Sequence, residues 1–223
     1  MTQSTAPLNP DDYIITRKRK KYKFAKFFNN PFCYEVDEWL PQKVDVLEMG
    51  AGTGLFSVAM AQARVAKKFL AVDVKADRLQ VGAIAAEAAG SNNLYFLRAR
   101  ADQLPGLIAL ASLEAIWVTF PDPFPKPRHA KNRLTYPKAL KIYQSLLAPG
   151  GALYFKTDAK NLFDWSLEQL VAEGWHITEL SFDLHDSNLS AEYKIKTTYE
   201  TRYTSEGLAI NFVKATPPTI VEA

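Results

Sequence analysis

The stretch VDVLEMGAGTG, residues 44–54, decides the fold predicted for this chain of 223 residues. Its first seven residues are mostly apolar and predict a short strand, and apolar side chains at helical spacing follow over residues 56–63. The glycines between them allow a tight turn and a close approach of the backbone to a ligand. A strand, a glycine loop and a helix in this order predict an open α/β sheet with a nucleotide-type site at the loop.

The spacing of the glycines and the acid before them narrow the choice of ligand. A dinucleotide fingerprint would place its third glycine at position 55, where this chain has Leu55, and no P-loop lysine follows. Glu48 precedes the first glycine, and its charge repels a pyrophosphate and attracts an ammonium group. The sequence therefore favours a cofactor that carries a cation, as S-adenosylmethionine does. The alternative is a glycine turn beside surface acids, with no ligand.

Further acids follow the next two predicted strands. Asp73 ends the strand at residues 69–74, where a carboxylate can accept both ribose hydroxyls of an adenosine. Asp102 follows the strand at residues 94–97, where an acid can bond the adenine amino group. The predicted cofactor-binding residues are Glu48, Gly50, Gly52, Gly54, Asp73, Asp102 and Asp122.

A fourth predicted strand, residues 115–120, leads to Asp122, a carboxylate between two prolines. Pro121 and Pro123 fix their own φ angles, and Pro123 pushes Asp122 toward extended geometry, so the loop is stiff before any ligand arrives. Because the carboxyl ends of parallel strands meet at one edge of a sheet, we expect Asp122 to face the donor bound at Glu48 and Asp73. The alternative is a proline-rich surface loop with solvated charges.

The cations are concentrated in two stretches, although the net charge is only +3. The first stretch lies between Asp122 and Asp158, where no acid occurs, and its cations are Lys126, Arg128, Lys131, Arg133, Lys138, Lys141 and Lys156. The second basic cluster occupies residues 17–26. Two such patches predict a polyanionic partner, because phosphate contacts supply most of the affinity for nucleic acid. A solvated charged surface is the alternative, and His129 is interpreted as a phosphate or loop contact.

The composition bounds the class of protein. An apolar fraction of 48% in 223 residues is enough for one substantial core. The single cysteine, Cys33, excludes an internal disulfide, and without clusters of cysteine and histidine we expect no metal site. No apolar run approaches the roughly 20 residues of a membrane helix, and the first residues are polar, so we expect a cytoplasmic protein without membrane contact.

The second half of the chain continues the alternation of helices and strands. We predict helices at residues 75–89, 134–147 and 161–173, and strands at residues 153–157, 176–184 and 209–214. The strand at 153–157 would deliver Lys156 and Asp158 to the edge that carries Asp122. A polar loop at residues 197–200 lies between the last two strands.

Four motifs together resemble the bacterial tRNA (guanine-N7)-methyltransferase family (TrmB): LEMGAGTG at 47–54, FPDPFPK at 120–126 followed by Arg128 and His129, KTD at 156–158 and TTYE at 197–200. The proline-framed motif is the most specific of them. The resemblance implies a class I S-adenosylmethionine-dependent methyltransferase: a Rossmann-like α/β fold with a seven-stranded, mostly parallel sheet and helices on both faces. It covers residues 35–223 as the methyltransferase domain, after a basic, partly disordered arm at residues 1–34.

The resemblance also implies the reaction and the residues that carry it. The methyl group of S-adenosylmethionine goes to N7 of guanine 46 in the variable loop of tRNA. Positions matching Glu48, Asp73, Asp102 and Asp122 contact S-adenosylmethionine, and Asp122 is also catalytic. The expected tRNA contacts are Lys126, Asp158, Thr197, Thr198, Tyr199 and Glu200, beside Arg128, His129, Lys131 and Arg133 of the basic stretch.

Three positions depart from the family pattern and several questions stay open. Phe124 stands where tryptophan is common, and Pro127 and Asn132 stand where a lysine and an arginine are, which predicts weaker tRNA affinity.

Asp122 either stabilises the positive charge that develops on the purine or orients the guanine by accepting hydrogen bonds from its N1 and N2 hydrogens. A methyltransferase for a small molecule and an RNA-binding protein without catalysis are the alternative functions. The chain is expected to be a monomer or a homodimer.

Overall fold

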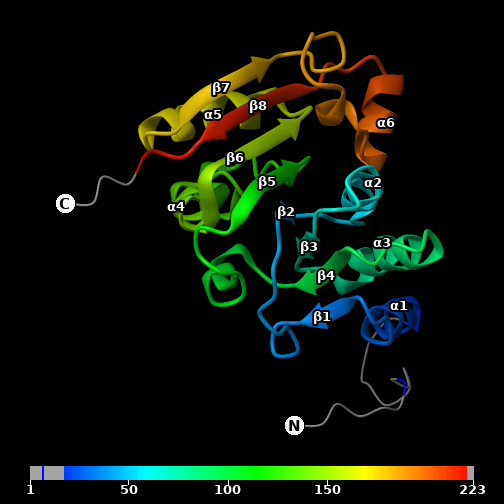
Figure 1. The fold of residues 1–223 in the computed structure, drawn as a ribbon. Helices are drawn as coiled ribbons and strands as arrows, with labels where there is room; N and C mark the ends of the chain where they lie inside the picture. The colour runs from blue at the N-terminus through cyan, green and yellow to red at the C-terminus, as the bar shows by residue number, and fades with distance from the viewer. Residues whose placement is uncertain (1–6, 8–17, 220–223) are drawn as a thin grey trace.

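The computed structural model describes residue 7 and residues 18–219, apart from the side chains at positions 18–21, 198, 199 and 202. Within this part, eight strands form one sheet in the order β1-β4-β3-β2-β5-β6-β8-β7 (Figure 1). The strands are β1 Cys33–Glu35, β2 Val46–Met49, β3 Phe69–Asp73, β4 Leu94–Arg98, β5 Leu113–Thr119, β6 Leu147–Thr157, β7 His176–Ser181 and β8 Asn211–Thr216. The six strands from β1 to β6 run parallel, and β8 is antiparallel to both of its neighbours. The α/β class is confirmed.

The sheet has one strand more than the seven predicted. Strands β2 to β8 correspond to the predicted ones, and β1 adds an edge by pairing Cys33 with Phe96 of β4. The prediction missed β1 because three residues are too few to show an alternation of apolar and polar side chains. Since Cys33 and Tyr34 belong to the sheet, β1 crosses the boundary predicted at residue 34.

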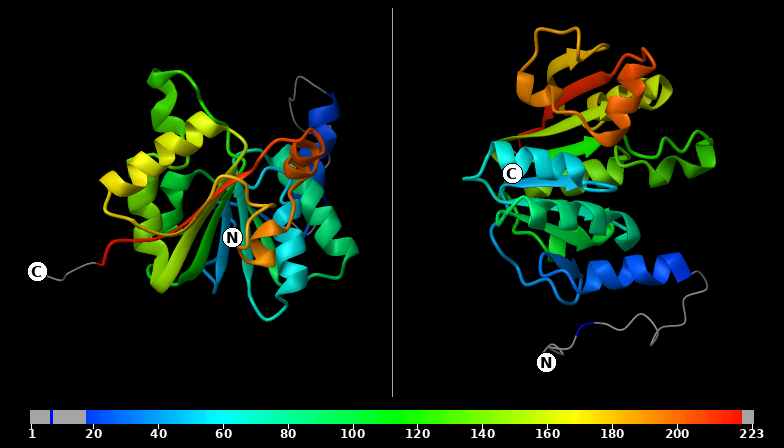
Figure 2. Two further views of the ribbon diagram at one scale, coloured as in Figure 1. Left: turned by 90° about the horizontal axis from the view of Figure 1, so that it is seen from above. Right: turned by 90° about the vertical axis from the view of Figure 1, so that its right-hand side faces the viewer.

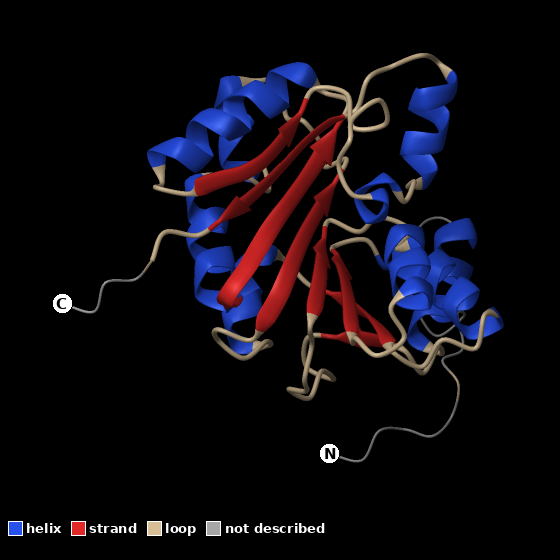
Figure 3. Ribbon diagram, turned by 45° about the horizontal axis from the view of Figure 1, so that its top comes forward, coloured by secondary structure: helices blue, strands red, loops and turns tan. Residues whose placement is uncertain are grey.

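Helices cover both faces of the sheet (Figures 2 and 3). The helices are α1 Lys18–Phe28, α2 Leu55–Ala63, α3 Ala76–Ala88, α4 Pro137–Leu146, α5 Lys160–Ala172 and α6 Thr198–Ser205. Alternate residues of the strands enter two cores: Leu47 and Met49 pack in the core below α4 and α5, and Val46 packs in the core below α2 and α3. This alternation is the period of two that a strand buried on both faces requires.

Helix α1 extends the second core toward the edge of the sheet. Ala25 and Phe27 are buried, and the helix contacts α3. Lys26 on the same helix is exposed. The described part of the predicted basic arm is therefore a helix packed on the body of the protein. Residues 1–6 and 8–17 lie outside the described residues.

The boundary between α4 and β6 differs from the prediction. Helix α4 ends at Leu146, and β6 begins at Leu147 instead of residue 153, so the glycines at 150 and 151 lie inside the strand. A Cβ atom on Gly151 would lie 2.6 Å from the carbonyl oxygen of Leu113, so only glycine lets the two strands approach here. The pairing with β5 is irregular at this point: Leu113 pairs with Leu147 and Ala115 pairs with Ala152, so the proline and the two glycines lie in a bulge of the strand.

The order of the strands reverses at β2, which pairs with β3 on one side and β5 on the other. Chain connections leave in opposite directions at this point, and the carboxyl ends of the strands leave a crevice there. The glycine loop follows β2, and the proline-framed acid follows β5. In the part of the chain that the structure describes, no helix has both the length and the apolar character needed to cross a membrane.

Candidate active site

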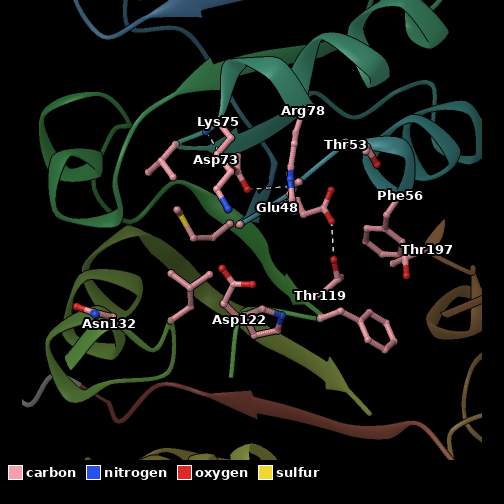
Figure 4. Close-up of a pocket in the computed structure, with 18 of the residues that line it drawn as sticks. Glu48, Thr53, Phe56, Asp73, Lys75, Arg78, Thr119, Asp122, Asn132 and Thr197 are labelled. Atoms are coloured by element: carbon pink, nitrogen blue, oxygen red, sulfur yellow. Dashed lines mark hydrogen bonds between the residues drawn. The ribbon is translucent and has the colours of Figure 1, made fainter. Parts of the chain in front are cut away.

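A cavity of about 210 Å³ opens where β2, β3 and β5 end (Figure 4). Five residues predicted for the cofactor site line it, namely Glu48, Gly50, Gly52, Asp73 and Asp122. The Asp122 carboxylate points into the cavity, on the side opposite Glu48 and Asp73. The topology therefore brings three carboxylates, from the ends of three neighbouring strands, around one space.

Glu48 is a buried carboxylate held by two hydroxyl groups. Ser57 Oγ donates to Oε2 at 2.6 Å and Thr119 Oγ1 donates to Oε1 at 2.7 Å, and the backbone N–H of Ser57 donates to Oε2 at 3.2 Å. Burial raises the pKa of Glu48 to about 7, against the lowering effect of these hydrogen bonds and of Lys156. A positive ligand group in the cavity would favour the ionised form.

The glycine loop and Asp73 hold each other in place. Gly50 has a φ angle of 74°, which strains any other residue, and a Cβ atom there would lie 2.6 Å from Leu134 Cδ1, so the Leu134 side chain would have to move. The N–H of Gly52 donates to Asp73 Oδ2, and the N–H of Lys75 donates to Oδ1, both at 2.9 Å. Gly54 begins α2 with a φ angle of 69° and shapes the turn without lining the cavity.

Asp102 does not join the other predicted cofactor residues in this structure. It lies on a short 3-10 helix, Ala101–Gly106, and its two oxygens accept from Arg100 Nε at 2.9 Å and from an Arg100 Nη at 3.2 Å. The hydrogen bond from Arg100 is the main cause of its lowered pKa. The arginine two residues earlier supplies a partner that the strand pattern alone did not reveal.

The proline loop presents its residues alternately to two sides. Asp122 and Phe124 line the cavity, and Pro123 and Pro125 line a second hollow beside α5. Phe120 and Phe124 have φ angles of 47° and 42°. Non-glycine residues in this left-handed region cost roughly 1–3 kcal/mol each and persist where the surroundings hold them. The stiffness from the prolines was predicted, and the left-handed turns were not.

The basic stretch after the loop divides into exposed and buried cations. A 3-10 helix, Pro127–Asn132, follows Lys126, and the exposed cations Lys126, Arg128 and Lys131 can reach a partner. His129 is partly buried. Arg133 is also partly buried, and its guanidinium donates to the backbone carbonyl of Phe124. Asn132, one of the departures from the family pattern, lines the cavity.

Lys156 is a buried ion-pair partner, and the expectation that it joins the basic surface is wrong. Its side chain is 0% exposed, and Nζ donates to Glu200 Oε2 at 2.7 Å, to the carbonyl of Ile195 at 2.7 Å and to that of Tyr193 at 3.2 Å. Burial lowers its pKa, although Glu200 acts in the opposite direction. The sequence predicts an exposed lysine at this position, because its buried partner Glu200 cannot be identified from the strand pattern.

The TTYE motif divides in a similar way. Thr197 lines the cavity, whereas Glu200 is 0% exposed and also accepts from Thr197 N at 3.1 Å and contacts His185 Nε2 at 2.8 Å. Glu200 thus lies behind the cavity wall rather than on a surface that tRNA could touch. Thr198 and Tyr199 begin α6, and their side chains lie outside the described part of the structure. Asp158 is partly buried, does not line the cavity, and has a pKa raised by burial.

Several residues of the site were not predicted. The hydroxyl groups of Ser57 and Thr119 donate hydrogen bonds to Glu48. Phe56, Lys75 and Arg78 line the cavity. Thr119 had a usable signal, because it is the last residue of β5, the strand that pairs with β2. Ser57 lies in the first turn of α2, next to the glycine loop, which is a second usable signal.

Comparisons with known proteins agree with this geometry. A family model described as "Putative methyltransferase" matches residues 42–213. The tRNA (guanine-N(7)-)-methyltransferase of Brevibacillus brevis is 38% identical over 197 residues, which are 86% of this chain and 91% of the relative. The enzyme of that name from Lachnoclostridium phytofermentans is 33% identical over 204 residues, 90% of this chain and 89% of the relative.

Solved structures share the fold at low sequence identity. The 16S rRNA methyltransferase KamB has a TM-score of 0.58 at 17% identity, covering 79% of this chain and 90% of that one. A 16S rRNA (adenine(1408)-N(1))-methyltransferase, in a structure described with cosubstrate SAM, has a TM-score of 0.56 at 14% identity and covers 98% and 95%. These likenesses show a class I methyltransferase fold. With the family model across residues 42–213 and relatives above 30% identity over most of both chains, the chain belongs to the tRNA (guanine-N7)-methyltransferase family.

Proposed function

We propose that this protein transfers the methyl group of S-adenosylmethionine to N7 of guanine 46 in the variable loop of tRNA. The observation that carries the proposal is that Glu48, the glycine loop, Asp73 and Asp122 all line one cavity. The relatives named for guanine-N7 methylation of tRNA support the acceptor. Position 46 is the family's site, implied by the resemblance of the motifs.

The donor side of the cavity suits S-adenosylmethionine. The buried Glu48 carboxylate offers a counter-charge for the ammonium of the methionine part. Asp73 stands at the end of β3, where its oxygens can accept ribose hydroxyls, and the N–H groups of Gly52 and Lys75 fix its orientation. S-adenosylmethionine supplies a methyl group on a sulfonium, which makes the methyl an electrophile.

The acceptor side suits a purine with an in-plane lone pair. Guanine N7 already has such a lone pair, so the protein has to align it and needs no strong base. Methylation leaves positive charge on the purine, and the preorganised Asp122 carboxylate can stabilise that charge or accept the guanine N1 and N2 hydrogens. Phe124, on the cavity wall beside Asp122, offers a ring on which the base can stack.

One experiment tests the whole proposal. The protein is incubated with methyl-labelled S-adenosylmethionine and tRNA from a strain that lacks 7-methylguanosine, and the label is mapped by digestion and mass spectrometry. We expect one labelled guanine, at position 46. Label on another base or position would contradict the finer assignment, and methylation of small molecules alone, or binding of tRNA without transfer, would contradict the function.

The raised pKa of Glu48 makes donor binding depend on pH. Folding raises this pKa from its ordinary value of 4.5 to about 7, so the free protein keeps the proton as the pH rises through 5 and 6 and loses it near 7. The ionised form binds the cationic donor, so we expect the Kd for S-adenosylmethionine to fall about tenfold between pH 6 and pH 8. Isothermal titration calorimetry measures this, and at pH 7 the heat should vary with the buffer because binding releases a proton.

The variant E48Q is the control for that profile. It cannot ionise, so it should bind the donor more weakly and lose most of the pH dependence. Between about pH 4.5 and pH 7 the folded protein holds this proton and the unfolded chain does not, so wild-type stability without donor should fall relative to E48Q over that range and level off above pH 7. An unchanged pH profile in E48Q would assign the titration to another group.

The exposed cations beside the proline loop are predicted to contact tRNA phosphates. Replacing Arg128 by alanine should raise the KM for tRNA and reduce the slope of log affinity against log salt by about 0.9. Lys43→Ala is the matched control, because Lys43 is an exposed cation ion-paired with Asp45, just before β2 and hence at the opposite edge of the sheet. Equal slopes for R128A and K43A would show that Arg128 does not contact phosphate.

A further inference from the structure

The loop at residues 121–125 is a thin wall between two hollows. Asp122 and Phe124 line the cavity on one side, and Pro123 and Pro125 line the hollow beside α5 on the other. Three of these five residues are prolines, which lack an N–H group, so the loop backbone can donate few hydrogen bonds. The position of Asp122 therefore depends on what holds this wall from behind.

Arg133 holds the loop from that side. Its Nη2 donates to the carbonyl oxygen of Phe124 at 3.0 Å, and its guanidinium lies 4.3 Å from the ring centroid of Trp165 on α5. Arg133 also lines the hollow behind the prolines. One planar cation thus joins the loop to α5, a helix that packs on one face of the sheet, by a hydrogen bond to the loop and by stacking on the helix.

The carbonyl that Arg133 bonds belongs to a residue in an unfavourable conformation. Phe124 has a φ angle of 42°, which nearby contacts must maintain. Phe124 and Asp122 both face the cavity, two residues apart. Release of the Phe124 carbonyl would let the peptide relax and would move Asp122 with it.

We propose that Arg133 is a positioning residue, which fixes the proline loop against Trp165 so that Asp122 and Phe124 keep their places at the acceptor side of the cavity. The inference rests on the proposed function, because the acceptor side is the part of the cavity where the guanine of tRNA is proposed to bind. It differs from the prediction made from the basic stretch, in which Arg133 contacts tRNA. Its guanidinium is engaged within the protein, whereas Arg128 is exposed.

The contrast between the two arginines gives the test. In R133A, kcat for methyl transfer should fall about 100-fold, the loss expected for a displacement of about 1 Å at the reacting groups. The salt dependence of tRNA binding should stay as in the wild type. In R128A, the salt slope should decrease and kcat at saturating tRNA should change much less. A lower salt slope in R133A, with its loss confined to KM, would overturn the proposal in favour of a phosphate contact.

Two further variants separate the geometry from the charge. R133K keeps the charge but loses the planar group that both stacks and donates, so its kcat should resemble that of R133A. W165L removes the stacking partner, and its effect should not add to that of R133A, because both variants release the same contact. Full activity in R133K, or additive losses in the double variant, would contradict the proposal.

Hydrogen exchange gives a readout that does not depend on activity. Peptides covering residues 120–134 should exchange faster in R133A than in the wild type, while peptides from β2 and β3 stay protected. If the wild type methylated no tRNA but this difference appeared, the proposed function would fail and the loop contact would stand. If the wild type methylated tRNA and exchange in this segment were unchanged, the role of Arg133 would fail alone.

Discussion

Replacing Asp122 by asparagine is expected to lower kcat for methyl transfer to tRNA by roughly 100- to 1,000-fold, the usual loss when one preorganised electrostatic group is removed. Asparagine has almost the same shape, so the prolines on either side should keep the loop in place. The change removes the negative charge that faces the cavity. Single-turnover assays with saturating donor and tRNA measure the step directly.

The two roles open to Asp122 can be separated with a modified substrate. Inosine lacks the 2-amino group of guanine, so a tRNA with inosine at the acceptor position removes one hydrogen that Asp122 could accept. If Asp122 orients the base, inosine should slow the wild type more than D122N. If it stabilises charge, inosine should slow both by the same factor. A kcat of D122N within about threefold of the wild type, with its structure intact, would remove Asp122 from the catalytic role.

Replacing Lys156 by methionine is expected to lower the free energy of unfolding by roughly 3–5 kcal/mol. Both members of the Lys156–Glu200 pair are fully buried, so either single substitution leaves a charge without its partner. Two backbone carbonyls, of Tyr193 and Ile195, also lose a donor. Urea denaturation measures the change, and Glu200→Gln should destabilise the protein to a similar degree.

The double variant K156M/E200Q is the control for the buried pair. It removes both charges, so it should be no less stable than either single variant, although the two carbonyls keep it below the wild type. The double variant should also bind S-adenosylmethionine more weakly. The N–H of Thr197 donates to Glu200, so the loss of the carboxylate should disturb Thr197, which lines the cavity. A double variant with the summed losses of the two single ones would show that the pair does not act as a unit.

The periodic parts of the fold could be predicted from the sequence. Strands β2 and β3 and the helices after them are long enough for their apolar patterns to show, and a glycine loop has few alternatives after such a strand. The motifs predicted the family, which the comparisons confirm. The cavity unites Glu48, Asp73 and Asp122 because the ends of parallel strands meet at one edge.

The remaining features depend on partners that a linear reading does not supply. Lys156 and Glu200 are 44 residues apart, and neither residue type predicts burial on its own. Arg133 lies among exposed cations in the sequence and differs from them only through Trp165 and the Phe124 carbonyl. Asp102 bonds to Arg100, and β1 is too short for any pattern. For Lys156 and Arg133 a tertiary contact, rather than a local preference, decides where the side chain lies, whereas Asp102 is held by a neighbour two residues away.

The order of the strands also has a consequence for biosynthesis. Strand β8 is the last of the described strands in chain order, yet it lies between β6 and β7, and β7 has β8 as its partner in the sheet. Until residues 211–216 emerge, β7 has no neighbour and the outer edge of β6 remains open. That part of the sheet can therefore close only after residues 211–216 have left the ribosome, and until then the uncovered strands are exposed to chaperones and to association with other nascent chains.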